Sequence, residues 1–357
     1  MIHRKEIIMK DQRIFLASDY METGHPKILK RFADLAYEKF DGYGFDPITE
    51  SAREKIRRAC GAPGADVYFI SGGTQTNKTI ISAFLKSYEG VLSARTGHVN
   101  THEGGAIELT GHKVLILPEK EGKISPDAIE RFAQNLQKDG NRDHFVQPGM
   151  VYLSQPTECG TIYSLEELSE ISKITHRYGM KLFVDGARLA YSLACPENDL
   201  TLKDLTKLAD VFYIGGTKCG AMLGEAVVIP EKNKIPHFFT LLKQHGSVLA
   251  KGWVCGVQFD VLFEDDLYLK IGARAVEQAQ RIRSICKAKG LEEYAKSPTN
   301  QIFIQFPDSL LEDLGKRVNY AYHEKTKEGF TAIRFCTSWA TPRADIDAFE
   351  KVMNELF

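Results

Sequence analysis

Short apolar runs alternate with longer amphipathic stretches through the middle of the chain. Six runs have the length and the β-branched or aromatic content of strands, and they span residues 67–70, 91–94, 113–117, 150–154, 181–184 and 210–214. Three stretches have helical spacing, over residues 77–88, 125–138 and 164–178. Two of them carry start signals, because Ser125 precedes Pro126 and Ser164 is followed three residues later by Glu167, as in a capping box.

The alternation of strands and helices predicts an α/β domain with a mainly parallel sheet covered on both faces, a three-layer α/β/α architecture. In such sheets, ligands bind beyond the carboxyl ends of the strands. Thr74, Asp185 and Lys218 each follow a predicted strand closely. We therefore expect these three side chains to lie near one another.

The pattern changes after Gly252. A long helical stretch is followed by alternating strands and helices, over residues 258–289, 301–306, 309–318, 330–335 and from 344 onward. This order predicts a small α+β domain. The expected parts are an N-terminal segment (1–45) that packs with the small domain or a partner subunit, a large domain with the candidate site (46–252) and the small domain (253–357).

Composition and charge exclude several classes of protein. The chain has 46 basic and 47 acidic residues and a formal net charge of −1, so nothing favours a nucleic-acid partner. No apolar run approaches the roughly 20 residues that cross a bilayer, and charges interrupt the N-terminus, which argues against a membrane protein or a signal peptide. The seven cysteines are scattered without a CxxC pair. We expect reduced thiols and a cytoplasmic location.

Lys218 is the first candidate for chemistry. It follows a predicted strand and the tight turn Gly215-Gly-Thr, and Gly220 lies two residues later. Glycines on both sides would let a flat cofactor approach the backbone closely, and a lysine amine can form a Schiff base with an aldehyde. The alternative is an ordinary surface lysine in a turn.

Asp185 ends the predicted strand 181–184. A carboxylate at the tip of a buried strand needs a cationic partner, and a protonated pyridine nitrogen is one such partner. Such a carboxylate would keep the ring protonated and hence a good electron sink. The alternative is a structural ion pair with Arg188.

The segment Ser71-Gly-Gly-Thr-Gln-Thr-Asn77 lies between a strand and a helix. Exposed amides at a helix start can bind phosphate, although the segment could also be a plain capped turn. It matches neither GxGxxG nor GxxxxGK[ST], which argues against a nucleotide-binding enzyme. His98 could stack on a pyridine ring or move protons. A metal site on His98 and His102 is not expected, because Glu103-Gly-Gly disfavours the helix that would align them.

We call residues 71–77 the phosphate cup. The order of this cup, His98, Asp185 and Lys218 along the chain resembles the aspartate-aminotransferase-like superfamily, called fold type I. The closer resemblance is to the low-specificity L-threonine aldolases, over residues of about 14 to 350. It rests on these motifs: Ser71-Gly-Gly-Thr-Gln-Thr-Asn77, Val184-Asp-Gly-Ala-Arg-Leu189, Gly216-Thr-Lys-Cys-Gly-Ala221, Ala17-Ser-Asp19, Tyr43-Gly-Phe-Asp-Pro47 and Ile333-Arg-Phe-Cys-Thr337.

The resemblance implies a pyridoxal 5′-phosphate enzyme with the cofactor on Lys218. Asp185 would bind the ring nitrogen, and His98 and Ala187 would cover the two ring faces. The implied cofactor-binding set is Gly73, Thr74, Gln75, His98, Asp185, Ala187, Arg188, Thr217, Lys218 and Lys251, with Lys251 given by a neighbouring subunit. The implied substrate-binding set is Ser18, Tyr43, Arg188 and Arg334, because a planar guanidinium suits a carboxylate.

One segment departs from the family pattern. Where many members read Glu-Asn-Thr-His-Asn-Gly, this chain reads Gln155-Pro-Thr-Glu-Cys-Gly160. Glu158 thus replaces a histidine credited with handling the substrate hydroxyl. A carboxylate can accept that proton too, so Glu158 joins Lys218, His98 and Asp185 as a catalytic candidate. The alternative is that Glu158 only shapes the loop.

The implied reaction is cleavage of L-threonine, L-allo-threonine or a related β-hydroxy amino acid to glycine and an aldehyde. In it, Glu158 or a histidine, His98 or His102, would take the hydroxyl proton. One alternative is another reaction on the same fold, such as β-elimination, transamination or decarboxylation. Another is a cofactor-free binding or regulatory protein in which Lys218 is idle. Fold type I sites are usually completed by a second subunit, so the resemblance also implies a homodimer or homotetramer.

Overall fold

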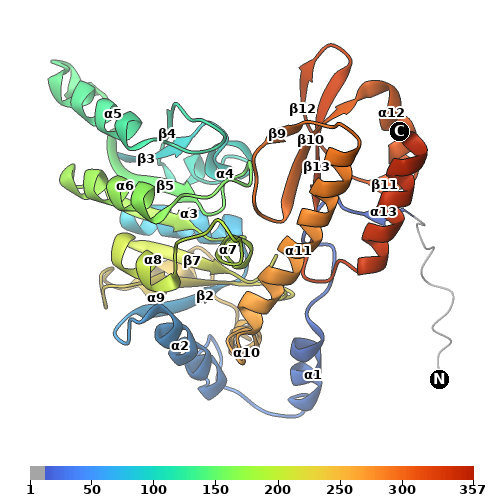
Figure 1. Cartoon of the computed structure of the whole chain (residues 1–357). Coiled ribbons are helices and arrows are strands. Elements are labelled where there is room, and N and C mark those ends of the chain that lie inside the picture. The colour runs from blue at the N-terminus through green and yellow to red at the C-terminus, as the bar shows by residue number, and fades with distance from the viewer. Residues whose placement is uncertain (1–12) are drawn as a thin grey trace.

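The computed structural model describes residues 13–357, which form a larger body around a seven-stranded sheet and a smaller body around a four-stranded sheet (Figure 1). The larger body is built on a seven-stranded sheet with the order β2-β8-β7-β6-β5-β3-β4. Its strands are β2 (Asp66–Ile70), β3 (Glu89–Ala94), β4 (Val114–Leu117), β5 (Gln147–Ser154), β6 (Lys181–Asp185), β7 (Val211–Gly215) and β8 (Glu225–Ile229). β8 is antiparallel to both neighbours, and the other pairs are parallel.

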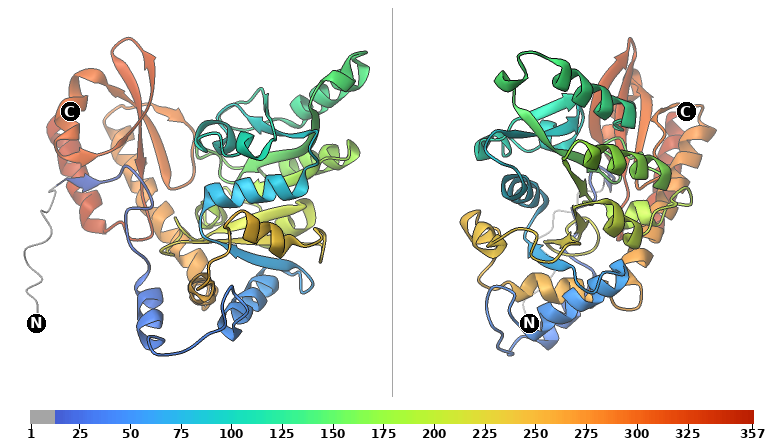
Figure 2. Two further views of the ribbon diagram at one scale, coloured as in Figure 1. Left: turned by 180° about the vertical axis from the view of Figure 1, so that it is seen from behind. Right: turned by 90° about the vertical axis from the view of Figure 1, so that its left-hand side faces the viewer.

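Helices cover both faces of this sheet, which confirms the predicted three-layer α/β architecture (Figures 1 and 2). On one face lie α3 (Gly73–Phe84) and α9 (Phe238–Gln244), which contact each other. The other face carries α5 (Pro126–Lys138), α6 (Leu165–Arg177), α7 (Leu189–Leu193), α8 (Leu202–Leu208) and, beside α8, α2 (Pro47–Cys60). The capping box predicted at Ser164 and Glu167 is present.

The helix expected over 77–88 was placed too late. It begins at Gly73 and ends at Phe84, directly after Gly72, whose extended backbone (φ −170°) forms the N-cap. Glycine has a low helix propensity, so the first turn gave no helical signal in the sequence. The earlier start matters because it brings the helix N-terminus next to the end of β2.

The smaller body contains an antiparallel four-stranded sheet with the order β12-β13-β10-β9. Its elements are β9 (Glu293–Ala295), β10 (Gln301–Pro307), α12 (Asp308–Gly315), β12 (Ala321–Lys327), β13 (Phe330–Cys336) and α13 (Arg343–Leu356). The long helical stretch expected over 258–289 contains two helices, α10 (Trp253–Leu262) and α11 (Leu267–Ala288). Asp265 and Asp266 lie between the two helices in left-handed backbone conformations (φ 51° and 56°), which interrupt the helical path just before α11.

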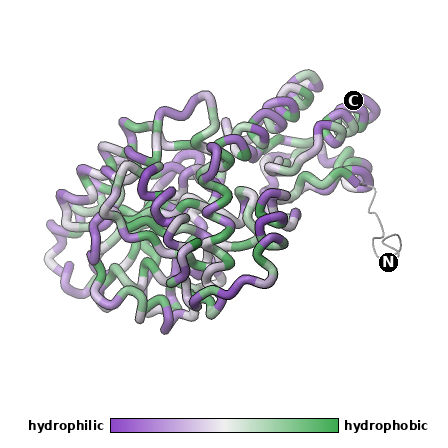
Figure 3. Tube along the Cα trace, turned by 90° about the horizontal axis from the view of Figure 1, so that it is seen from below, coloured by the Kyte–Doolittle hydropathy of each residue, from purple (hydrophilic) through white to green (hydrophobic). Residues whose placement is uncertain are grey.

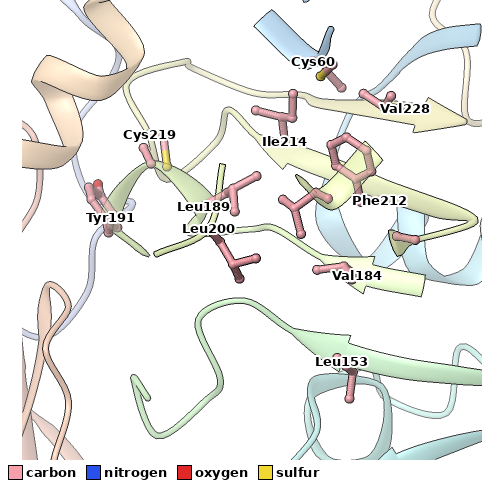
Figure 4. Close-up of a cluster of buried hydrophobic side chains, with 14 of the residues drawn as sticks. Cys60, Leu153, Val184, Leu189, Tyr191, Leu200, Phe212, Ile214, Cys219 and Val228 are labelled. Atoms are coloured by element: carbon pink, nitrogen blue, oxygen red, sulfur yellow. The ribbon is translucent and has the colours of Figure 1, made fainter. Parts of the chain in front are cut away.

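A larger and a smaller hydrophobic core meet within α11. Residues of α11 up to Val276 pack in the larger core, whereas Ala279 and Ile282 pack in the smaller one. Figure 4 shows part of the larger core, where Leu153 and Phe212 come from different strands of the central sheet. Along the surface helices in Figure 3, hydrophilic and hydrophobic positions alternate, as expected for helices that bury one face. The division into two domains stays a prediction, with α11 as the element that both cores share.

The N-terminal segment contacts both bodies. β1 (Ile14–Phe15) pairs in parallel with β11 (Val318–Asn319) beside the smaller body, and α1 (Pro26–Asp34) packs on α10. Residues 1–12 of the expected 1–45 segment lie outside the described residues. A four-residue helix, α4 (His98–Thr101), follows β3 near the centre of the molecule. No helix among residues 13–357 is long and apolar enough to span a bilayer.

Candidate active site

Lys218 and Asp185 line the same cavity at the carboxyl ends of the parallel strands. The sequence-predicted residues that share this cavity are Gly73, Thr74, His98, Glu158, Ala187, Arg188 and Thr217. A second cavity adjoins it on the side of the smaller body and is lined by Arg334. Both cavities are lined by His98, Glu158, Arg188 and Lys218. The fold therefore brings together most residues that the sequence singled out.

Asp185 is 4% exposed and is held by four hydrogen bonds. The hydroxyls of Tyr152 and Tyr213 each donate to it at 2.5 Å, Asn77 Nδ2 donates at 3.0 Å and the Ala187 amide at 2.9 Å. Burial opposes ionisation, but His98 and the hydrogen bonds outweigh it and lower the pKa of Asp185. The Arg188 guanidinium is not its partner, so the structural ion pair considered from the sequence is not formed.

Lys218 lies on a turn that only glycine could form. A Cβ on Gly216 would come 2.5 Å from the Gly224 carbonyl oxygen, and one on Gly215 would come 2.3 Å from the Ala187 carbonyl oxygen. The Tyr191 hydroxyl donates to the Lys218 carbonyl oxygen at 2.5 Å, which fixes the backbone. No described side chain forms a hydrogen bond or ion pair with the Lys218 amine.

The amides at the start of α3 face this cavity. Gly72 provides no side-chain cap, and a Cβ there would contact nothing within 4 Å, so an anion could reach the first amides of the helix. Gly73 and Thr74 line the cavity, whereas Gln75 lies outside its lining and donates from Nε2 to the Gly246 carbonyl at 2.6 Å. The Thr217 hydroxyl donates to Glu225 at 2.7 Å, a partner that the sequence did not suggest.

His98 is oriented by a buried acid. Its Nδ1 lies 2.6 Å from Glu103 Oε1, and the same oxygen accepts from Asn77 Nδ2 at 2.9 Å. Because Asn77 Nδ2 also binds Asp185, one amide group links the two carboxylates. His102 stacks on His98 with ring centroids 5.4 Å apart. Within residues 13–357, no cluster of three or more His, Cys, Asp or Glu could hold a metal ion.

Glu158 lies between the two cavities and lines both. Its Oε1 accepts from the His98 amide at 2.8 Å and from the Ser154 hydroxyl at 2.6 Å. Burial is the largest influence and raises the pKa of Glu158, which favours proton exchange closer to neutral pH. The carboxylate thus holds α4 in place and is also open to both cavities.

Two arginines mark the far end of the site. Arg188 makes a bidentate pair with Asp19, through Nε to Oδ2 at 2.7 Å and Nη2 to Oδ1 at 3.0 Å. Arg334 donates from Nη1 to Gln301 at 3.1 Å and from Nη2 to the Ala17 carbonyl at 3.1 Å. The Arg334 Nε and Ser18 Oγ are buried without a hydrogen-bond partner, so both donors are available to a ligand that reaches them.

A family model for beta-eliminating lyases matches residues 16–308. The chain belongs to the beta-eliminating lyase family. The low-specificity L-threonine aldolase of Pseudomonas sp. (strain NCIMB 10558) is 31% identical over 343 residues, which cover 95% of this chain and 96% of that protein. The solved structure of threonine aldolase from Leishmania major superposes with a TM-score of 0.93 at 39% identity and covers 96% of this chain and 99% of that one. An aspartate aminotransferase of Thermus thermophilus (TM-score 0.70, 14% identity, 96% of each chain) shares the fold.

This member of the beta-eliminating lyase family is therefore a lyase that depends on pyridoxal 5′-phosphate, on the fold type I scaffold. The residues present fit that cofactor. The α3 amides suit its phosphate, the ionised Asp185 suits a protonated ring nitrogen, and the unpaired Lys218 amine suits its aldehyde. His98 and Ala187 line the cavity as the proposed ring contacts require.

Tyr43 and Lys251, two further predicted site residues of this lyase, line neither cavity of their own chain. Tyr43 lines a separate apolar cavity with Phe45 and Phe239, and Lys243 Nζ lies 3.9 Å from its ring centroid. Lys251 is exposed just before α10. A role for either residue in the site requires a neighbouring subunit, as the resemblance implied for Lys251.

Sequence reasoning missed most of the partners that orient the predicted residues. They are Asp19, Asn77, Glu103, Tyr152, Ser154, Tyr213 and Glu225. A weak signal existed for two of them, because Tyr152 and Tyr213 are polar-tipped aromatics near the carboxyl ends of apolar strands. Asp19 and Asn77 stood inside motifs that were noticed for other residues.

Proposed function

We propose that the protein cleaves L-threonine, L-allo-threonine or a related β-hydroxy amino acid into glycine and an aldehyde. The observation that carries this proposal is that the cavity of Lys218 and Asp185 adjoins the cavity of Arg334, since Lys218, Glu158 and Arg188 line both. An amino acid could thus place its carboxylate at Arg334 while its amino group reaches the cofactor. The similarity to threonine aldolases over nearly the whole chain supports the same reaction.

In this proposal, the Lys218 amine would hold the cofactor through its aldehyde, and Asp185 would keep the ring nitrogen protonated. The bound cofactor supplies an electron sink for the pair released at Cα. Arg334 and Ser18 would hold the substrate carboxylate and so orient the substrate for cleavage of its Cα–Cβ bond. Glu158, ionised, accepts the proton of the β-hydroxyl group as that bond breaks.

The remaining assignments follow the same reasoning. Gly73, Thr74 and Thr217 lie around the proposed phosphate position, although the Thr217 hydroxyl is already donated to Glu225. Because Arg188 is bound to Asp19 through two nitrogens, its contribution to the substrate carboxylate would come from the remaining Nη1. We also propose a homodimer or homotetramer in the cytoplasm, supported by the position of Tyr43 and Lys251 outside their own cavity and by seven free cysteines.

The test is to incubate the purified protein with L-threonine and with L-allo-threonine and to measure acetaldehyde and glycine in equal amounts. Lys218→Ala should abolish both products and the cofactor's absorbance near the visible edge. Lys173→Ala, at an exposed position of α6, is the matched control and should change neither. A keto acid product would instead favour transamination or β-elimination on the same scaffold. No aldehyde from either isomer, nor from phenylserine, would overturn the aldolase proposal.

A further inference from the structure

Glu225 is a buried acid that the proposed reaction does not use. It is the first residue of β8, lies opposite Ile70 of β2 on one side and Gly215 of β7 on the other, and is 3% exposed. β2 leads directly into the phosphate cup. β7 leads into the turn that carries Lys218, which we call the lysine turn. Glu225 therefore lies between the two segments that would hold the ends of the cofactor's phosphate arm.

The Glu225 carboxyl group lines the cavity together with Gly73 and Thr74. Its Oε2 accepts from the Gly216 amide at 2.9 Å and its Oε1 accepts from the Thr217 hydroxyl at 2.7 Å. These two bonds tie the turn that presents Lys218 to β8. The same group thus fixes the lysine turn and faces the place where the phosphate would bind.

The side-chain charges of the cavity oppose the attraction that the α3 amides exert on an anion. Among the described residues, Asp185, Glu158 and Glu225 line the cavity against one unpaired cation, Lys218, and the Arg188 charge is balanced by Asp19. A phosphate dianion next to an ionised Glu225 would bring like charges together in a site with little water. A proton on Glu225 removes one of them and lets the carboxyl group donate a hydrogen bond toward the phosphate.

We propose that Glu225 binds a proton when the cofactor's phosphate group enters the cup, so that cofactor affinity depends on protonation at this position. This inference rests on the dependence of the protein on pyridoxal 5′-phosphate and is independent of the aldol cleavage. Glu225 is then a positioning residue in two respects, because it holds the lysine turn and sets the pH range in which the cofactor binds.

The surroundings of Glu225 agree with such a role. Burial raises its pKa to about 7, while the bonds from Thr217 and Gly216 and the charge of Lys218 oppose the rise. The titratable groups that face it are Lys218, Asp185, Tyr213, Cys219, Cys255 of α10 and Tyr268 of α11. Burial raises the pKa of each of these cysteines and tyrosines, so they stay neutral near pH 7. Glu225 is therefore poised to change its charge near neutral pH.

The sign of the effect follows from the two states. A nearby dianion raises the pKa of Glu225 further, so the bound state carries the proton over a wider pH range than the free state. Below pH about 7, Glu225 already carries the proton in the cofactor-free protein, so cofactor binding needs no proton uptake. Above that pH, the fraction of free protein with a protonated Glu225 falls about tenfold per pH unit, and the affinity for the cofactor falls with it.

The experiment measures binding of pyridoxine 5′-phosphate, which lacks the aldehyde, to the full-length protein freed of cofactor, by calorimetry between pH 6 and pH 9. The ratio of the Kd of the unaltered protein to that of Glu225→Gln should rise about tenfold per pH unit above 7. Glu119→Gln is the matched control, because Glu119 is an acid with an 8% exposed side chain that accepts from a threonine hydroxyl at 2.6 Å but lines a different cavity. It should behave like the unaltered protein.

A second measurement keeps the test valid if Glu225→Gln does not fold. At pH 8, calorimetric titrations in two buffers of different ionisation enthalpy should show the uptake of close to one proton per bound ligand. The same uptake is expected in Lys218→Ala, in which the lysine amine cannot be the group that binds the proton. A constant Kd ratio from pH 6 to pH 9, or no proton uptake at pH 8, would overturn the proposal. Aldolase activity enters neither measurement, so failure here and failure of the proposed reaction remain distinct.

Discussion

The guanidinium of Arg188 holds both carboxylate oxygens of Asp19, at 2.7 Å and 3.0 Å, and joins the N-terminal segment to the turn after β6. Both side chains are largely removed from water, and Asn300 Nδ2 donates a third bond to Asp19 at 2.9 Å. Burial opposes ionisation of Asp19, but Arg188 and Lys218 outweigh it and lower its pKa to about 2. The pair thus fixes one wall of the active site.

We predict that Asp19→Asn destabilises the protein by about 3 to 5 kcal/mol at pH 7, because Arg188 is left buried without a partner. The pKa of Asp19 is about 2 in the folded protein and about 4 in the unfolded chain, so its ionisation stabilises the fold above pH 4. This stabilisation is lost as the pH falls from about 4 to about 2. The variant should therefore lack that part of the acid sensitivity. Urea unfolding at pH 7 and pH 3 measures both effects. Asp34→Asn, which breaks an exposed pair with Lys30, should change stability by less than about 1 kcal/mol.

The tyrosines that donate to Asp185 give a second prediction. Removing either hydroxyl, in Tyr152→Phe or Tyr213→Phe, takes away a bond to a charged group worth about 1.5 to 3 kcal/mol. The pKa of Asp185 should rise, so that Asp185 holds the ring nitrogen less firmly in its protonated form. Because the protonated ring is the better electron sink, kcat should fall by about 10- to 100-fold. Steady-state kinetics and the cofactor's absorbance spectrum measure the change. Tyr163→Phe, which alters a buried tyrosine that binds the Ile124 amide, should leave the spectrum unaltered.

Arg334 carries the third prediction. Its buried Nε lacks a partner and its two Nη atoms are held by Gln301 and Ala17, so the guanidinium is oriented in advance. Arg334→Lys keeps the charge but loses the planar donor set, and we expect KM for the amino acid to rise by about 10- to 100-fold. Arg317→Lys, at an exposed pair with Glu355, is the control. An unchanged KM in Arg334→Lys would remove the arginine from the carboxylate site.

Local patterns were enough to predict the parallel strands and the residues at their ends. The runs before Asp185 and Lys218 are apolar and short, and the capping box at Ser164 is a signal contained within four residues. The partners of Asp185 could not be predicted in the same way, because Tyr152 and Tyr213 approach it only once the sheet aligns β5, β6 and β7.

Two other features depend on contacts that are distant in the chain. β8 is a short run that begins with a charged residue, and its strand character comes from pairing with β2 and β7. The pairing of Asp19 with Arg188 spans 169 positions. No spacing rule in the sequence could connect these residues, since the intervening sheet determines which side chains meet.

The position of Lys251 gives a fourth prediction. Because it lies outside the cavity of its own chain, its proposed phosphate contact must come from another subunit. Lys251→Ala should weaken cofactor binding, and Lys218→Ala should be inactive. When the two variants are dissociated, mixed and reassembled, hybrid oligomers contain one site with both lysines intact, so part of the activity should return. No recovery in verified hybrids would place the Lys251 contact within one chain or remove it altogether.

Glu158 gives the last prediction, which separates the proton-accepting role from a purely structural one. Glutamine can still accept the bonds from the His98 amide and the Ser154 hydroxyl, but it cannot take up a proton. Glu158→Gln should therefore keep the fold and the cofactor spectrum while kcat falls by about 10²- to 10⁴-fold, the usual contribution of a general base. Burial raises the pKa of Glu158, so activity of the unaltered enzyme should fall as pH drops through a value above the ordinary 4.5, and this acidic limb should be missing in the variant. Activity within twofold of the unaltered enzyme would show that Glu158 only shapes the loop, and it would leave His98 or His102 as the group that takes the hydroxyl proton.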